Sequence, residues 1–85
     1  MIEGKTASGF EYVITDERLD NYDLLKKWKA WVEGNRFAFY DFPALLLGED
    51  GAKALEEHCR VDGRISTKAI EQEIREIIRV KPLKN

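Results

Sequence analysis

The sequence predicts a mainly α (α+β) domain, in which a short N-terminal β-hairpin precedes a compact bundle of about four helices. A run rich in β-forming residues occurs only within the first fifteen positions. Most of the remaining chain repeats apolar residues every three or four positions, which is the spacing of helices packed on a core. The chain has 85 residues, enough for one domain and too few for two. We therefore expect a single domain with a hairpin over residues 3–15, helices over 20–80 and a loose tail over 81–85.

The hairpin prediction depends on residues 11–15, which are rich in β-branched and aromatic side chains. Ser8-Gly9 can make a tight turn that pairs residues 3–7 with residues 10–15. Because an isolated hairpin is marginal in water, the apolar face of its second strand should pack against the helices. By alternation, the side chains on that face are those of Phe10, Tyr12 and Ile14.

The first long helix is expected to begin after Asp20 or Asn21, either of which can cap it. Gly34-Asn35 is a stop signal at its other end. Between these ends, apolar residues fall at positions i, i+1, i+4, i+7 and i+8, which places them on one stripe. The residues of this predicted core stripe are Leu24, Leu25, Trp28, Trp31 and Val32.

The middle of the chain is aromatic, and residues 36–41 have no clean period. Pro43 suits the first turn of a helix that Asp41 would cap, because proline has no amide hydrogen to donate there. A short helix is therefore expected over residues 42–47. Gly48 should end or bend it.

Two further helices are expected in the second half of the chain. Asp50 can cap one that runs to about Cys59, and Asp62-Gly63 marks a turn after it. Ser66 can cap the last helix, which should end at Val80. The inward residues are expected to be Ala52, Leu55 and Cys59 on the first of these helices, and Ile70, Ile74, Ile77 and Ile78 on the last.

Composition argues against several classes of protein. The formal net charge of −2 argues against duplex DNA as a partner, so no nucleic acid is expected. No run of about eighteen apolar residues occurs, so we expect no membrane-spanning segment. The start of the chain also lacks the apolar run of a secretory signal. A single cysteine, Cys59, rules out a disulfide within the chain and fits a reducing compartment such as the cytoplasm.

Residues suited to catalysis or metal binding are sparse. His58 and Cys59 are the only adjacent base and nucleophile, but neighbouring helix positions point about 100° apart. With one histidine and one cysteine in the chain, a zinc site would lack its usual ligands. A calcium loop at Asp62-Gly63 would put Ala69 where a bidentate glutamate is required. No glycine-rich phosphate loop occurs either. We therefore expect no enzyme, no metal and no cofactor.

An excess of aromatic and leucine residues marks the middle of the chain. Most of them must belong to the core, but residues 37–42 lack a period that would bury every ring in one place. We therefore predict an apolar patch used for self-association or for a partner protein. The candidate binding residues are Phe37, Phe39, Tyr40 and Leu47.

Five short motifs occur in a characteristic order between residues 5 and 80. Each alone is a turn or a leucine-rich stretch, while their order and spacing together are more specific. They are Lys5-Thr6-x-Ser8-Gly9-Phe10-Glu11-Tyr12, Leu19-Asp20-Asn21-Tyr22-Asp23-Leu24-Leu25, Leu45-Leu46-Leu47-Gly48, Leu55-x-x-His58, and Asp62-Gly63-Arg64 before the final helix.

This arrangement resembles the small tail assembly chaperones of long-tailed phages and prophages of Gram-positive bacteria. The resemblance implies a cytoplasmic assembly factor that binds the tape measure protein and keeps it soluble until tail tube subunits polymerise around it. It transfers no binding residues, because the family has no compact signature for them. Two alternatives stand beside it: a structural tail component, such as a connector or minor tail protein, and a small regulator that binds nucleic acid.

Overall fold

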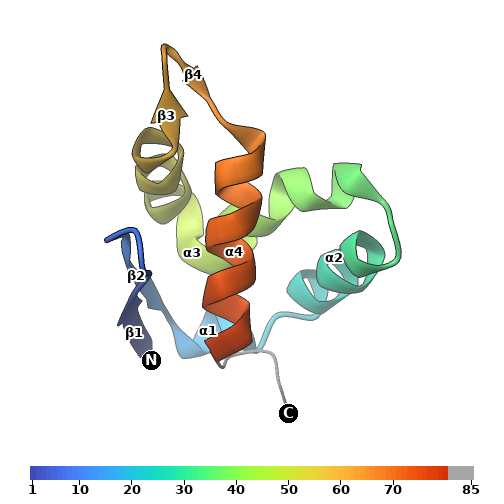
Figure 1. The fold of residues 1–85 in the computed structure, drawn as a ribbon. Coiled ribbons are helices and arrows are strands. Elements are labelled where there is room, and N and C mark those ends of the chain that lie inside the picture. Colours follow the sequence, from blue (N-terminus) through green and yellow to red (C-terminus); the bar gives the residue numbers. More distant parts are fainter. Residues whose placement is uncertain (81–85) are drawn as a thin grey trace.

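The computed structural model describes residues 1–80, and the predicted loose tail, residues 81–85, lies outside the described residues. The fold is mainly helical with a short N-terminal hairpin, as the sequence predicted (Figure 1). One long, bent helix, α3, contacts α1, α2, β2 and α4 and is therefore the centre of the fold. The elements are β1 (Ile2–Lys5), β2 (Glu11–Ile14), α1 (Asp16–Leu19), α2 (Tyr22–Val32), α3 (Arg36–His58), β3 (Arg60–Val61), β4 (Arg64–Ile65) and α4 (Thr67–Val80).

The predicted N-terminal hairpin is present, with strands slightly shorter than expected. β1 and β2 pair antiparallel in a register that sets Ile2 opposite Ile14 and Gly4 opposite Tyr12. The loop between them is closed by Thr6, whose hydroxyl accepts a hydrogen bond from the Phe10 amide at 3.1 Å. As predicted, the buried face of the second strand consists of Phe10, Tyr12 and Ile14.

α2 begins where the sequence indicated, because the Asn21 side chain accepts a hydrogen bond from the Asp23 amide at 2.9 Å. Its predicted core stripe is partly wrong. Leu24 and Trp31 are buried and Trp28 is half-buried, whereas Leu25 and Val32 are exposed. The cause is that α2 packs on α3 along one narrow side, so a residue about 100° further round the helix faces outward. A single-turn helix that the sequence did not predict, α1, precedes α2.

α3 begins earlier than predicted and is longer. Asn35 caps it by accepting a hydrogen bond from the Phe37 amide at 3.0 Å, so Asp41 is not a cap and Pro43 lies inside the helix. The predicted bend at Gly48 is present, since this residue has a left-handed backbone with φ 81°. The helix expected from Asp50 to about Cys59 is present as the second half of α3, which resumes after the non-helical Gly48, but Asp50 lies in its first turn and does not cap it. The predicted inward residues of that half, Ala52, Leu55 and Cys59, are buried.

The last helix follows a two-residue turn between β3 and β4. Asp62 and Gly63 both have positive φ, 51° and 83°, which is the conformation of a type I′ hairpin turn. Ser66 caps α4 as predicted, with its hydroxyl accepting a hydrogen bond from the Ala69 amide at 3.1 Å. The predicted stripe of α4 faces the core: Ile70, Ile74 and Ile77 are buried and Ile78 is partly buried.

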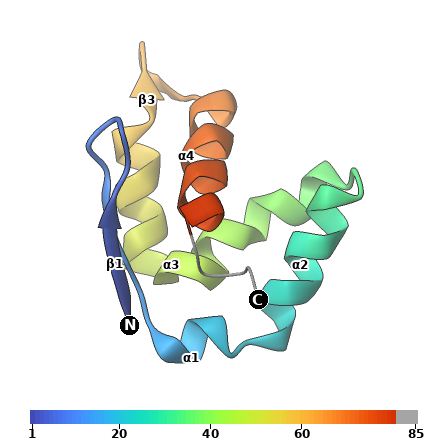
Figure 2. The ribbon, with the colours of Figure 1, turned by 60° about the horizontal axis from the view of Figure 1, so that its bottom comes forward.

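The bend at Gly48 divides α3 into two arms with different neighbours (Figure 2). α2 packs on the first arm, and the β1–β2 hairpin runs beside the second. α4 lies in the angle between the two arms (Figures 1 and 2). The core at their junction consists mainly of Ile14, Leu24, Phe42, Leu46, Leu55, Ile74 and Ile77, the largest fully buried side chains.

Candidate functional site: an apolar groove between α3 and α4

The four predicted binding residues divide into two pairs in the structure. Phe37 and Tyr40 are 88% and 85% exposed, as a binding surface requires. Phe39 and Leu47 are only 9% and 4% exposed and belong to the core, so their assignment to one exposed patch is wrong. Phe39 packs against Trp31, with ring centroids 4.7 Å apart. The physical reason is that Phe39 follows Phe37 by about 200° around the helix, which sends the two rings to opposite sides.

The first arm of α3 is apolar on two sides, and this explains why residues 36–41 showed no clean period. Phe37, Tyr40 and Ala44 have the spacing i, i+3 and i+7 and share the outward side. The opposite side supplies Ala38, Phe39, Phe42 and Leu46 to the core.

Phe37 and Tyr40 stand beside a groove of about 1150 Å³. One wall is the first arm of α3, and the other consists of Glu56 on the second arm together with the start of α4. The floor is apolar and consists of core side chains that each retain a little exposed surface, namely Trp31, Phe39, Ala52 and Ile70. The groove exceeds the usual size of a small-molecule pocket, about 300–1000 Å³, and its aromatic rim extends into solvent.

Four charged residues line the groove, and two of them are paired within the described residues. Asp41 lies 3.3 Å from the Lys27 amine, and Glu71 lies 3.2 Å from the Arg75 guanidinium. Glu71 also accepts a longer hydrogen bond, 3.4 Å, from the indole nitrogen of Trp31. Two lining residues, Arg36 and Glu56, form no ion pair with any residue in the range 1–80.

A second apolar surface lies on the outside of α2. Tyr22, Leu25 and Val32 are exposed there and border a shallow hollow of about 470 Å³. Lys26 and Lys29 lie among them, and the Lys26 amine stands 5.7 Å from the centre of the Tyr22 ring. We name this set of residues the α2 stripe.

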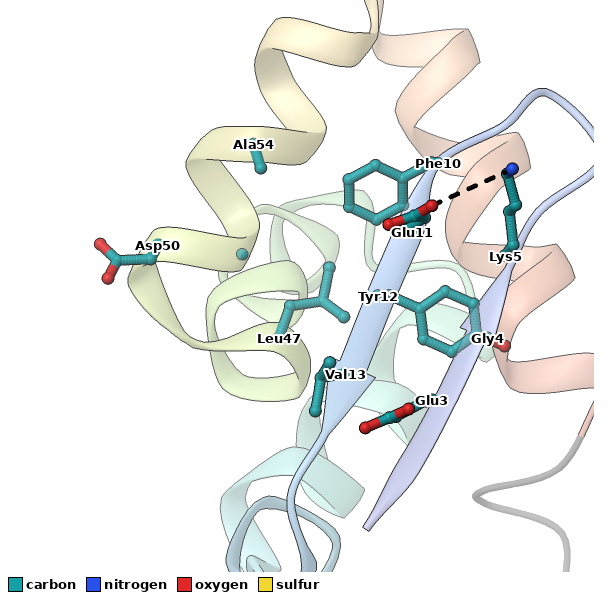
Figure 3. A pocket seen from close by; sticks show the side chains of 11 residues that line it. Glu3, Gly4, Lys5, Phe10, Glu11, Tyr12, Val13, Leu47, Asp50 and Ala54 are labelled. Carbon is teal, nitrogen blue, oxygen red and sulfur yellow. Dashed lines mark ion pairs between the residues drawn. The ribbon is translucent and has the colours of Figure 1, made fainter.

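A third hollow, of about 790 Å³, lies between the β1–β2 hairpin and the second arm of α3. Figure 3 shows the side chains that line it. Leu47 lines this hollow rather than the groove, which separates it from Phe37 and Tyr40. Lys5 and Glu11 form a 4.0 Å ion pair on its wall, and Asp50 stands across from them. Among its lining residues there is no histidine, cysteine, serine or threonine to act as a nucleophile.

The hairpin loop brings together polar residues that the sequence did not group. The Ser8 hydroxyl donates to the Glu73 carboxylate at 2.7 Å and lies 2.8 Å from Nε2 of His58. Since the hydroxyl has one proton, and that proton goes to Glu73, His58 donates to Ser8 instead of activating it. This order differs from that of a catalytic triad, in which the histidine lies between the other two residues. The cluster therefore fastens the loop to α3 and α4.

Cys59, next to this cluster, is buried as predicted. Burial, and to a smaller extent the nearby Glu73 carboxylate, raises the pKa of the Cys59 thiol to about 11. At neutral pH the thiol is therefore protonated and unreactive. Within residues 1–80, no three His, Cys, Asp or Glu side chains are placed to hold a metal ion.

No helix in that range is long and apolar enough to cross a membrane. A scan against protein-family models, a search of curated proteins and a search of solved structures each gave no match to this chain.

Proposed function

We propose that this protein is a tail assembly chaperone, which binds the tape measure protein of a long-tailed phage or prophage and keeps it soluble during tail morphogenesis. The observation that best supports a binding role is the exposure of Phe37 and Tyr40 beside the apolar groove. Aromatic side chains held in water beside an apolar floor are typical of protein association sites. The choice of partner depends on the motif resemblance described above.

The groove is suited to the apolar face of a helix. Its walls are helices, so an inserted helix would pack as the elements of this fold pack on one another. Helices bound in grooves use side chains at i, i+3, i+4 and i+7, and the floor of Trp31, Phe39 and Ile70 offers apolar contacts for such a row. A chaperone that covers apolar helical segments of a long, aggregation-prone protein would keep it soluble in the bacterial cytoplasm.

The test is co-expression with the tape measure protein from the same genome, followed by affinity capture and mass analysis. The wild-type chain should keep the tape measure protein in the soluble fraction and co-purify with it. The double variant Phe37→Ser/Tyr40→Ser should lose both effects. Tyr22→Ser is the matched control, since Tyr22 is an exposed aromatic residue outside the groove.

Two results would count against the proposal in different ways. A tape measure protein that stays insoluble with or without the wild-type chain would reject the chaperone function. Normal binding by the folded double variant would reject the groove as the binding surface. Finding the chain in purified virions would favour the structural tail component instead.

A further inference from the structure

We propose that in the free protein the groove is occupied by a second copy of the same chain. The two copies form a two-fold dimer in which Phe37 and Tyr40 of each enter the groove of the other. This inference goes beyond binding of the tape measure protein and does not depend on it, because it concerns the chain alone.

The arrangement of the surface favours a two-fold contact. In such an interface the same patch occurs on both sides, so the patch must contain both the projecting group and the hollow that receives it. Phe37 and Tyr40 project from the wall of the groove itself. A copy that inserts them therefore presents its own groove to its partner.

The charges around the groove support the same arrangement. Arg36 precedes Phe37 on one wall and Glu56 lies on the other, and neither forms an ion pair within residues 1–80. When Phe37 enters the partner's groove, Arg36 is carried toward the partner's Glu56. Two-fold symmetry makes this contact twice, so two unpaired acids and two unpaired bases are matched.

The surface area that the two copies could bury between them is small. A large aromatic side chain buries about 150–250 Å², so four of them, two from each copy, account for roughly 700 Å². Stable interfaces bury about 1,200–2,000 Å² in total, and the groove floors, whose side chains are at most 9% exposed, add little to the aromatic contribution. We therefore expect a weak dimer, with a dissociation constant in the micromolar range or above.

The α2 stripe is a poorer place for a second copy. Packing it on itself about a two-fold axis would bring Lys26 against Lys26 of the second copy, because it lies near the middle of the helix, whereas Lys29 is already paired with Glu33 at 2.7 Å. Like charges placed together oppose association.

The experiment is sedimentation equilibrium of the purified chain over a range of concentrations, without any partner protein. Wild type should show a monomer–dimer equilibrium. Arg36→Glu and Glu56→Arg should each weaken dimerisation by about tenfold or more, because each replaces two attractive pairs with two repulsive ones. An equimolar mixture of the two variants should dimerise again, since every 36–56 pair in the heterodimer has opposite charges.

Phe37→Ser should abolish the dimer, while Tyr22→Ser should leave it unchanged. Circular dichroism of each variant establishes that it is folded, and both charged positions are exposed. A wild-type chain that stays monomeric up to about 1 mM would overturn the proposal. So would species larger than a dimer, which require a head-to-tail contact, or folded charge variants that fail to pair when mixed.

Discussion

The phenol ring of Tyr12 lies across the backbone of Gly4, its partner on the neighbouring strand of the β1–β2 hairpin. A methyl group at Gly4 would overlap the ring, which is itself buried against the helices. Because residue 4 has no side chain, the Tyr12 ring can pack across its backbone and against the core. It links the shape of the hairpin to the packing of the domain.

Gly4→Ala should therefore lower the free energy of unfolding by about 1–3 kcal/mol, the usual cost of overpacking a well-packed site. Urea denaturation measures the change. In a Tyr12→Leu background the same substitution should cost much less, because the overlapping ring is gone. Equal costs in the two backgrounds would show that the ring is not the obstacle.

Phe37 and Phe39 provide a matched pair of one residue type, two positions apart on one helix. Phe39→Ala should lower the free energy of unfolding by about 3–5 kcal/mol, because it removes a buried ring packed on Trp31. Phe37→Ala should change it by less than about 0.5 kcal/mol, since that ring is in solvent. Thermal and urea unfolding of dilute samples, in which the proposed dimer is dissociated, provide the measurement. A large loss at Phe37 would mean that its ring packs within the monomer.

The hydrogen bond from Ser8 to Glu73 offers a test of loop anchoring. Glu73 is buried, and its other carboxylate oxygen has no partner among the described residues. Ser8→Ala should cost about 1–3 kcal/mol of stability, because a buried charge loses a donor. A Glu73→Gln background removes that charge, so the added cost of Ser8→Ala should fall there. Urea denaturation of the four proteins forms a double-mutant cycle, and additive effects would contradict the proposed coupling.

The raised pKa of the Cys59 thiol predicts that the free energy of unfolding falls at alkaline pH. Its folded pKa, about 11, lies above the ordinary value of 9.0, so above about pH 9 the unfolded chain loses the thiol proton before the folded chain does. The stability that the protonated thiol contributes should therefore be fully present below about pH 9 and be lost as the pH rises toward about 11, which lowers the free energy of unfolding by about 3 kcal/mol at most. The pKa of Tyr12 is also raised, by burial and then by Glu76, and adds to the decline above about pH 10.

Cys59→Ala isolates the contribution of the thiol. The variant should be less stable overall, because it leaves a small cavity, but its stability should fall less steeply between about pH 9 and about pH 11. Urea denaturation at several pH values gives both quantities. An unchanged slope would mean that the thiol does not titrate with folding.

Elements whose signals are local were predictable from the sequence. Strand alternation placed Phe10, Tyr12 and Ile14 correctly, and the cap at Ser66 with its isoleucine stripe placed α4. The bend at Gly48 followed from the backbone freedom of glycine. In each case the deciding residues lie within about one or two helical turns or strand positions of each other.

The start of α3 was predicted too late because Asn35 belongs both to the end of α2 and to the start of α3. Asn35 was interpreted as part of the stop signal after α2, yet its side chain also caps α3. The competing signal, Asp41 before Pro43, favoured a later start. Because the first arm of α3 is apolar on two sides, residues 36–41 show no single apolar stripe, and the sequence therefore did not indicate a helix there.

The candidate site could be predicted only in part. Nothing local distinguishes Phe37 from Phe39, since the choice of buried side depends on where α2 and α4 pack. Once Ala38, Phe39, Phe42 and Leu46 are recognised as the core stripe, the remaining Phe37, Tyr40 and Ala44 form a second row that marks the exposed side. The contact between Ser8 and Glu73, 65 residues apart, leaves no such pattern.

Gly48 sets the angle between the two walls of the groove. The first arm of α3 joins the second through this single left-handed residue, and the Arg18 guanidinium fills the space where a side chain would stand. The groove has one wall on each side of that junction. Any side chain introduced at residue 48 would meet the Arg18 guanidinium, so the angle between the two walls of the groove is set at a position that requires glycine.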